Sequence, residues 1–184
     1  MSRLLLFCLA SLGITMLSRR SLREARSHGF YRFFAFEALA GLILLNAPRW
    51  FRRPLIPRQI LSWLALVASG ALAVHGFYLL RVVGRPREGE GDEDTLIHGF
   101  EDTSELVRVG AYKYIRHPLY ASLLLLGVGA FLKDPSSLPT RLLLALTASL
   151  AATARVEEAE NLRRFGPAYG DYIAETKMFV PYVL

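Results

Sequence analysis

The chain alternates long apolar runs with short charged stretches. The apolar runs cover about residues 3–18, 33–47, 59–80, 119–132 and 138–154. A helix needs about 20 mostly apolar residues to span a bilayer, so runs of this kind are typical of spanning helices. The pattern predicts an all-α, polytopic integral membrane protein with about five transmembrane helices.

The last two apolar runs are separated by a stretch with the composition of a turn. Residues 133–139 contain an aspartate, two prolines and two serines. We therefore expect a helical hairpin in the C-terminal part of the chain. The fourth run is short for an average bilayer, and it either spans with local thinning or forms a partly re-entrant helix.

The distribution of basic residues predicts an orientation. With the N-terminus outside, 15 of the 22 lysines and arginines fall in cytoplasmic parts and 7 in outer parts. The positive-inside rule favours this arrangement, in the inner or cytoplasmic membrane. It places the loop 81–116 and the C-terminal segment 155–184 together in the cytoplasm. Four arginines between residues 49 and 58 lie on the outer side, against the rule.

Composition excludes several other classes of function. The formal net charge of +6 could indicate nucleic-acid binding, but the arginines cluster at the ends of apolar runs, where they contact lipid headgroups. Cys8 is the single cysteine, and the four histidines are scattered, so no metal site is expected. The first apolar run resembles a signal peptide, but its basic cluster follows the run, so we expect a retained helix.

Two regions are expected along the chain. Residues 1–100 would hold three transmembrane helices and a loop, and residues 101–184 would hold the chemistry. Within the loop, residues 85–95 are charged and contain glycine, which predicts a solvated linker, with a gate over a cytoplasmic site as the alternative. Gly127 and Gly129 lie in an apolar run, where small residues allow helices to pack closely.

A first polar cluster precedes the fourth apolar run, at residues 110–120. Pro118 stands where a first-turn proline belongs, and Tyr120 follows two residues later. Backbone N–H groups at this helix start could bind a carboxylate. The alternative is an aromatic belt at the depth of the lipid headgroups.

A second polar cluster, residues 157–169, continues the fifth apolar run without a breaker as far as Gly166. The helix should therefore project from the membrane into the cytoplasm. Thr153, Glu157 and Asn161 share one helix face, and carboxylates so near a bilayer need water or a partner. The alternative is an exposed, charged helix extension.

Two ionisable side chains, Glu37 and His75, lie inside the second and third apolar runs. Ionisable groups within a membrane are functional candidates by default. We expect both to line a substrate cavity, unless they reach the interface by snorkelling.

Taken in order, the two clusters and the C-terminal aromatic residues form a motif series. It is carried by Gly110, Tyr112, Arg116, His117, Pro118, Tyr120, Glu157, Glu158, Phe165, Gly166, Tyr169, Tyr172, Phe179 and Pro181. This series resembles the isoprenylcysteine carboxyl methyltransferase family and the related phospholipid methyltransferases. The resemblance covers about residues 104–182.

The resemblance implies a membrane methyltransferase whose S-adenosylmethionine site is built from helices. By motif position the cofactor would be held by Ser104, Glu105, Leu106, Val107, Tyr112, His117, Pro118, Leu119, Tyr120 and Glu157. The C-terminal segment would fold over the cofactor, and a lipophilic or prenylated substrate would enter from the membrane lipid. Arg116 and His117 are the catalytic candidates. Arg116 would orient an anionic acceptor or the methionine carboxylate, and His117 or a glutamate could take a proton from an amine acceptor.

The sequence departs from the family pattern at three positions. Ser122 replaces a usual glycine, Asn161 replaces a common leucine, and Thr153 stands where a substrate-contacting arginine is expected. Arg155 lies nearby on another helix face and is kept as a substrate-binding candidate.

These departures bear on the isoprenylcysteine substrate more than on the cofactor. The acceptor stays open between a prenylated cysteine carboxylate, a phospholipid amine and a small thiol. Two other functions stay open as well: an NADPH-dependent membrane reductase of related helical fold, and a non-catalytic accessory subunit.

Overall fold

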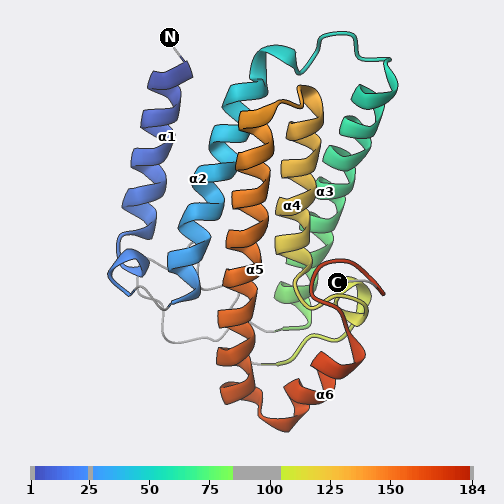
Figure 1. The fold of residues 1–184 in the computed structure, drawn as a ribbon. Helices are drawn as coiled ribbons and strands as arrows, with labels where there is room; N and C mark the ends of the chain where they lie inside the picture. Colours follow the sequence, from blue (N-terminus) through green and yellow to red (C-terminus); the bar gives the residue numbers. More distant parts are fainter. Residues whose placement is uncertain (1–2, 25–26, 85–104, 183–184) are drawn as a thin grey trace. The chain divides into compact units, whose positions relative to one another are not determined.

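The computed structural model describes residues 3–24, 27–84 and 105–182, and these residues form helices without a strand. The helices are α1 (Arg3–Ser18), α2 (His28–Asn46), α3 (Pro57–Val82), α4 (Pro118–Lys133), α5 (Ser137–Phe165) and α6 (Pro167–Glu175) (Figure 1). Short 3-10 turns occur at Ser21–Arg23, Ala47–Arg49 and Gly110–Lys113. The prediction of an all-α fold is confirmed.

Each of the five apolar runs corresponds to a helix, but the helices differ in length. Three are long and apolar enough to cross a membrane: His28–Arg49, Pro57–Val82 and Ser137–Phe165. The other two, α1 and α4, are apolar but have 16 residues each. Length and composition therefore support three spanning helices in the described part of the chain. The linker expected at residues 85–95 lies outside the described residues.

The second helix begins earlier than its apolar run. We expected it from Phe33, and it begins at His28, because the Ser27 hydroxyl accepts a hydrogen bond of 3.2 Å from the Phe30 N–H. Such an N-cap satisfies a backbone donor that the helix itself leaves unpaired. The cap decides where the helix starts, whereas the apolar run shows only which part is hydrophobic.

The chain divides into two compact units that are discontinuous in sequence. Unit 1 comprises Met1–Gly70 and Leu123–Glu157, and unit 2 comprises Ala71–Ser122 and Glu158–Leu184. The helices α3, α4 and α5 each contribute one part to each unit. The expected division at residue 100 separates two continuous parts of the chain. A difference in function between these two parts stays a prediction.

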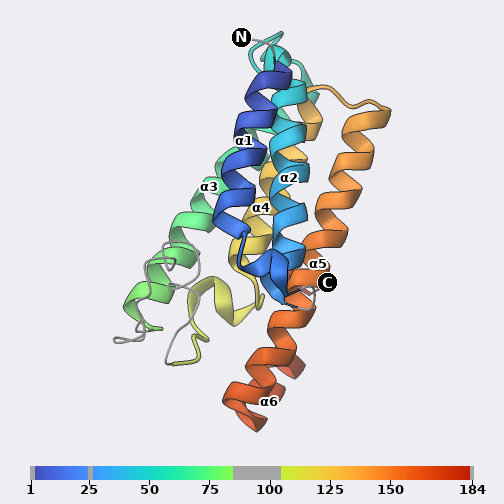
Figure 2. The same ribbon diagram turned by 90° about the vertical axis from the view of Figure 1, so that its left-hand side faces the viewer.

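Unit 1 is a packed group of helices in which α1 lies alongside α2 (Figure 1, Figure 2). Leu42 on α2 and Leu146 and Leu150 on α5 are fully buried. A Cβ atom at Gly127 would lie 2.3 Å from Leu146, and one at Gly129 would lie 2.8 Å from Leu66. Both glycines therefore allow close packing of α4, as expected from the sequence.

Gly129→Ala is expected to destabilise the protein by about 1–3 kcal/mol, the usual result of overpacking a core. The added methyl group would meet Leu66 and, at 3.2 Å, the backbone oxygen of Ser62, which cannot rotate away. Gly70→Ala is the matched control, because nothing lies within 4 Å of a Cβ there. Thermal unfolding in detergent measures both, and equal stability of the two variants would contradict the packing.

Unit 2 joins the last part of α3 to the segment that precedes α4. Leu79 and Leu80 of α3 pack with Val107 and Tyr112 in a buried cluster. Gly110 has a φ of +58°, a conformation that suits glycine, and a Cβ there would lie 2.6 Å from the His75 ring nitrogen. This tight turn places residues 110–113 against α3 and fixes the direction in which the chain enters α4.

Candidate functional site

The centre of unit 2 is a network in which the ion pair of Arg116 and Glu158 also contacts His117. Arg116 Nε donates to Glu158 Oε1 at 2.6 Å, and His117 Nε2 lies 3.2 Å from the same oxygen. The side chains are 9%, 3% and 14% exposed, respectively. Hydrogen bonds between charged groups are short and strong, so this network fixes the beginning of α4 to the last part of α5.

A second set of contacts joins the same segment to the end of α6 and to the residues that follow it. Arg116 Nη1 donates to the carbonyl oxygens of Thr176, at 2.5 Å, and Ile173, at 3.2 Å. The backbone of Arg116 donates to Lys177 O at 2.8 Å, and Lys177 N donates to Tyr114 O at 3.1 Å. Ile115 and Lys177 form a parallel β-bridge. We call residues 176–179 the tail segment.

The tail segment pairs with the two backbone N–H groups that directly precede α4. Arg116 N is paired with Lys177 O, and His117 N donates to Met178 O at 3.2 Å. A carboxylate at these two N–H groups would have to displace the tail segment. These two N–H groups precede the first residue of α4, Pro118, so the expected carboxylate site at the helix start itself stays a prediction.

Aromatic side chains surround the network. The rings of His117 and Tyr120 are stacked with centroids 5.4 Å apart, and Phe179 lies 6.2 Å from His117. Tyr169 and Tyr172 are in edge contact at 5.7 Å. All of these side chains are buried, as is Tyr112. The site thus combines charged groups with aromatic faces that exclude water.

Tyr172 ties α6 to the turn at residues 110–113. Its hydroxyl donates to the carbonyl oxygen of Tyr112 at 2.7 Å. Burial raises the pKa of Tyr172 well above its usual range, so the hydroxyl stays neutral and remains a donor. The Arg108 guanidinium lies 5.4 Å from the centre of the Tyr172 ring and donates to Ala168 O.

Most of the predicted cofactor-binding residues lie within unit 2. The buried ones are Val107, Tyr112, His117, Pro118 and Tyr120. Leu106 and Leu119 are half-buried, and Leu119 packs against the cluster of Leu79 and Val107. Glu105 is exposed, and Ser104 lies outside the described residues. Their role in binding a cofactor stays a prediction.

The carboxylate of the network is Glu158, the neighbour of the predicted Glu157. Glu157 is half-buried and is the last residue of unit 1, whereas Glu158 contacts Arg116 and His117 in unit 2. Successive residues on an α-helix point about 100° apart. The two glutamates therefore leave α5 in different directions. The sequence indicates the adjacent pair of glutamates, but it does not indicate which of the two faces Arg116.

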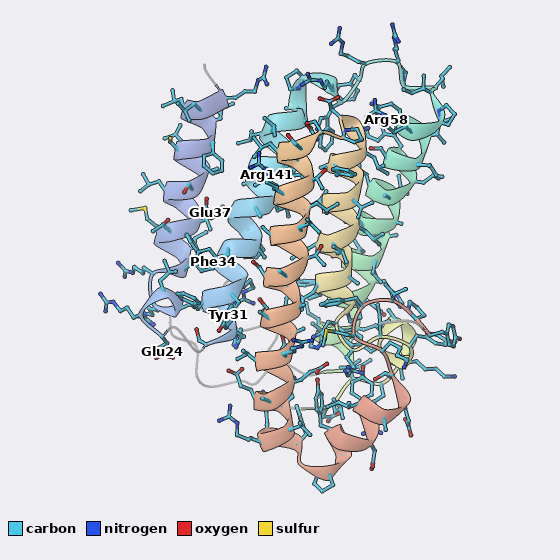
Figure 3. All side chains as sticks on the ribbon, in the orientation of Figure 1. Glu24, Tyr31, Phe34, Glu37, Arg58 and Arg141 are labelled. Carbon is cyan, nitrogen blue, oxygen red and sulfur yellow. The ribbon has the colours of Figure 1, made fainter. Side chains whose placement is uncertain are left out.

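The three predicted substrate-binding residues lie in different places. Glu37 is on α2 in unit 1, where its Oε1 is buried without a hydrogen-bond partner among the described residues (Figure 3). Arg155 is exposed on α5 in unit 1. His75 is exposed on α3 in unit 2, beside Gly110. Of the three, His75 shares a unit with the ion-pair network.

Two of the departures from the family pattern are satisfied locally. The Thr153 hydroxyl donates to Ser149 O at 2.8 Å, and the Ser122 hydroxyl donates to Leu119 O at 2.6 Å. Both bonds lie within the residue's own helix, so neither hydroxyl group introduces an unsatisfied buried donor. Asn161, the third departure, is half-buried on α5.

Within the described residues, no three histidine, cysteine or acidic side chains are grouped as a metal site would require. The candidate site therefore offers organic chemistry: a carboxylate, a guanidinium, an imidazole and buried tyrosines. Known proteins give no further guide to its use. No protein-family model, characterised protein or solved structure matches the chain.

Proposed function

We propose that the protein is an integral membrane methyltransferase that transfers a methyl group from S-adenosylmethionine to a lipophilic acceptor. The observation that carries the proposal is the buried network of Arg116, His117 and Glu158 within a shell of tyrosines. These residues belong to the motif series that resembles the methyltransferases. The proposed orientation, with the N-terminus outside, places the site at the cytoplasmic face.

The donor set fits the polar end of S-adenosylmethionine. Arg116 uses Nε and Nη1 within the protein, which leaves Nη2 without a hydrogen-bond partner among the described residues. Both contacts of Glu158 with Arg116 and His117 involve Oε1, which leaves Oε2 without a hydrogen-bond partner among the described residues. A guanidinium donor beside a carboxylate acceptor suits the carboxylate and ammonium of a methionine group, through charge-assisted hydrogen bonds. Tyrosine faces suit a sulfonium cation.

When bound, the cofactor supplies an already activated methyl group, so the protein mainly orients the acceptor and excludes water. Buried Tyr120 and Phe179 beside His117 provide the dry surface. For an amine acceptor, His117 would serve as the base that takes the proton, and Glu158, 3.2 Å from His117 Nε2, would orient the imidazole ring. A carboxylate or thiolate acceptor needs no such base.

An accessory role has one observation in its favour. Arg116 and His117 direct two backbone N–H groups and most of their side-chain donors to internal partners. A network that serves only to hold the tail segment would look the same. The cofactor-binding measurement separates the two proposals, since a structural clamp needs no ligand.

Calorimetric titration of S-adenosylmethionine into the full-length protein in detergent tests the proposal. We expect saturable binding, competition by S-adenosylhomocysteine, and loss of binding in His117→Ala while circular dichroism shows the native helix content. Binding of NADPH in place of S-adenosylmethionine would favour the reductase. If the folded protein binds neither compound, the accessory role replaces the methyltransferase proposal.

A further inference from the structure

A separate cluster of polar side chains lies in unit 1, around the last residue of α4. Lys133, the last residue of α4, is 1% exposed, and its ammonium lies 3.6 Å from the centre of the Trp63 ring and 5.5 Å from that of Trp50. Its carbonyl oxygen accepts hydrogen bonds from Arg58 Nη1 at 2.8 Å and Gln59 Nε2 at 3.1 Å. The end of α4 is therefore tied to the beginning of α3.

Three buried atoms of this cluster have no hydrogen-bond partner among the described residues: Lys133 Nζ, Trp50 Nε1 and Gln59 Oε1. Ring faces stabilise the positive charge of Lys133, but they leave N–H donors of the ammonium unused. Gln59 is 2% exposed, so water does not reach its oxygen freely. Buried polar atoms in folded proteins nearly always have a partner. Two unpaired donors and one unpaired acceptor thus indicate a ligand that offers acceptors to the donors and a donor to the acceptor.

The loop beside the cluster has the composition of a lipid-headgroup contact. Residues 49–58 contain four arginines, which with Lys133 give five basic side chains against one acid, Asp134. Asp134 is paired with Arg49 at 2.8 Å. On the same loop, Phe51 is 79% exposed and Leu55 is 85% exposed. Basic side chains interleaved with protruding apolar ones are typical of the membrane interface and attract anionic lipids.

We propose that this cluster binds the headgroup of an anionic phospholipid that carries a hydroxyl group, such as a phosphatidylglycerol. Phosphate oxygens would accept from Lys133 Nζ and Trp50 Nε1, and a headgroup hydroxyl would donate to Gln59 Oε1. The site lies in unit 1 and is independent of the proposed methyl transfer. It also gives the loop arginines, which run against the positive-inside rule, a role in binding lipid.

The chain offers a direct reporter for this site. Trp50 and Trp63 are its two tryptophans, and both flank Lys133. We would titrate the full-length protein, in nonionic detergent, with short-chain phosphatidylglycerol and follow tryptophan fluorescence. A saturable change is expected with phosphatidylglycerol, and an affinity about tenfold or more weaker with phosphatidylcholine of the same chain length. Inorganic phosphate is the third titrant, because it separates a lipid site from a site for free phosphate.

Lys133→Met keeps the length of the side chain and removes its charge, and it should weaken binding about tenfold or more. Arg141→Gln is the matched control, since Arg141 is an exposed basic residue of unit 1 that donates to its own helix at Ser137 O. If Lys133→Met does not fold, the exposed double variant Arg52→Gln, Arg53→Gln should weaken binding in the same direction. Equal binding of phosphatidylcholine, saturation by phosphate alone, no fluorescence change in the native protein, or full binding by both lipid-site variants would each overturn the proposal.

Discussion

Arg116→Met is expected to lower the free energy of unfolding by about 3–5 kcal/mol, the usual effect of removing one partner from a buried ion pair. The substitution leaves Glu158 without its closest partner, at 2.6 Å, and frees two carbonyl oxygens at the end of α6. Urea or thermal unfolding in detergent, followed by circular dichroism, measures the loss.

Two further variants show whether the network itself causes this loss. Arg163→Met removes an exposed arginine of α5 that donates to its own helix, and it should change stability by less than about 0.5 kcal/mol. The double variant Arg116→Met, Glu158→Leu should recover part of the loss, because the unpaired charge is gone. If the single variant is as stable as the Arg163→Met control, the network does not hold unit 2 together.

Glu158→Gln is expected to weaken binding of S-adenosylmethionine about 100-fold, within the range for neutralising a buried, hydrogen-bonded charge that faces a ligand. Glutamine keeps the shape of the side chain and an oxygen for Arg116, so the fold should survive. Glu157→Gln is the matched control on the adjacent residue, and it should change the affinity by less than about threefold. Calorimetric titration of both variants and the native protein gives the comparison.

The two glutamate variants also show which of the two glutamates binds the cofactor. The motif position favours Glu157 as the cofactor ligand, whereas the hydrogen bonds favour Glu158. Loss of binding in Glu157→Gln alone would return the role to Glu157. Full binding by both variants would remove the glutamate pair from the cofactor site.

The bounds of the helices could be predicted closely because they depend on residues within or next to each helix. Uninterrupted apolar runs gave α1 its bounds of Arg3–Ser18, and they placed the beginning of α4 within one residue of Pro118. The turn between α4 and α5 followed from proline and serine, which interrupt the apolar pattern. Where a polar cap starts the helix, as Ser27 does for α2, hydrophobicity alone misses the first residues.

The partners within the site could not be predicted because their cause is distant in sequence. Glu158 faces Arg116 through the packing of unit 2, and a pair of adjacent glutamates carries no signal for which one turns inward. The pairing of Lys177 with Tyr114 and Arg116 likewise leaves no local pattern. The same holds for Lys133, whose placement over Trp63 depends on how α3 and α4 meet.

The pairing of the tail segment has a consequence for how the protein is made. Arg116 and Thr176 are 60 positions apart, so the ribosome adds Thr176 60 residues after Arg116 itself. Chains are synthesised from the N-terminus at about 5–20 residues per second. For several seconds the beginning of α4 therefore has neither Glu158 nor the tail segment. Unit 1 has received its last residue, Glu157, before Glu158 is added, so unit 2 obtains its ion pair only after all of unit 1 has been synthesised.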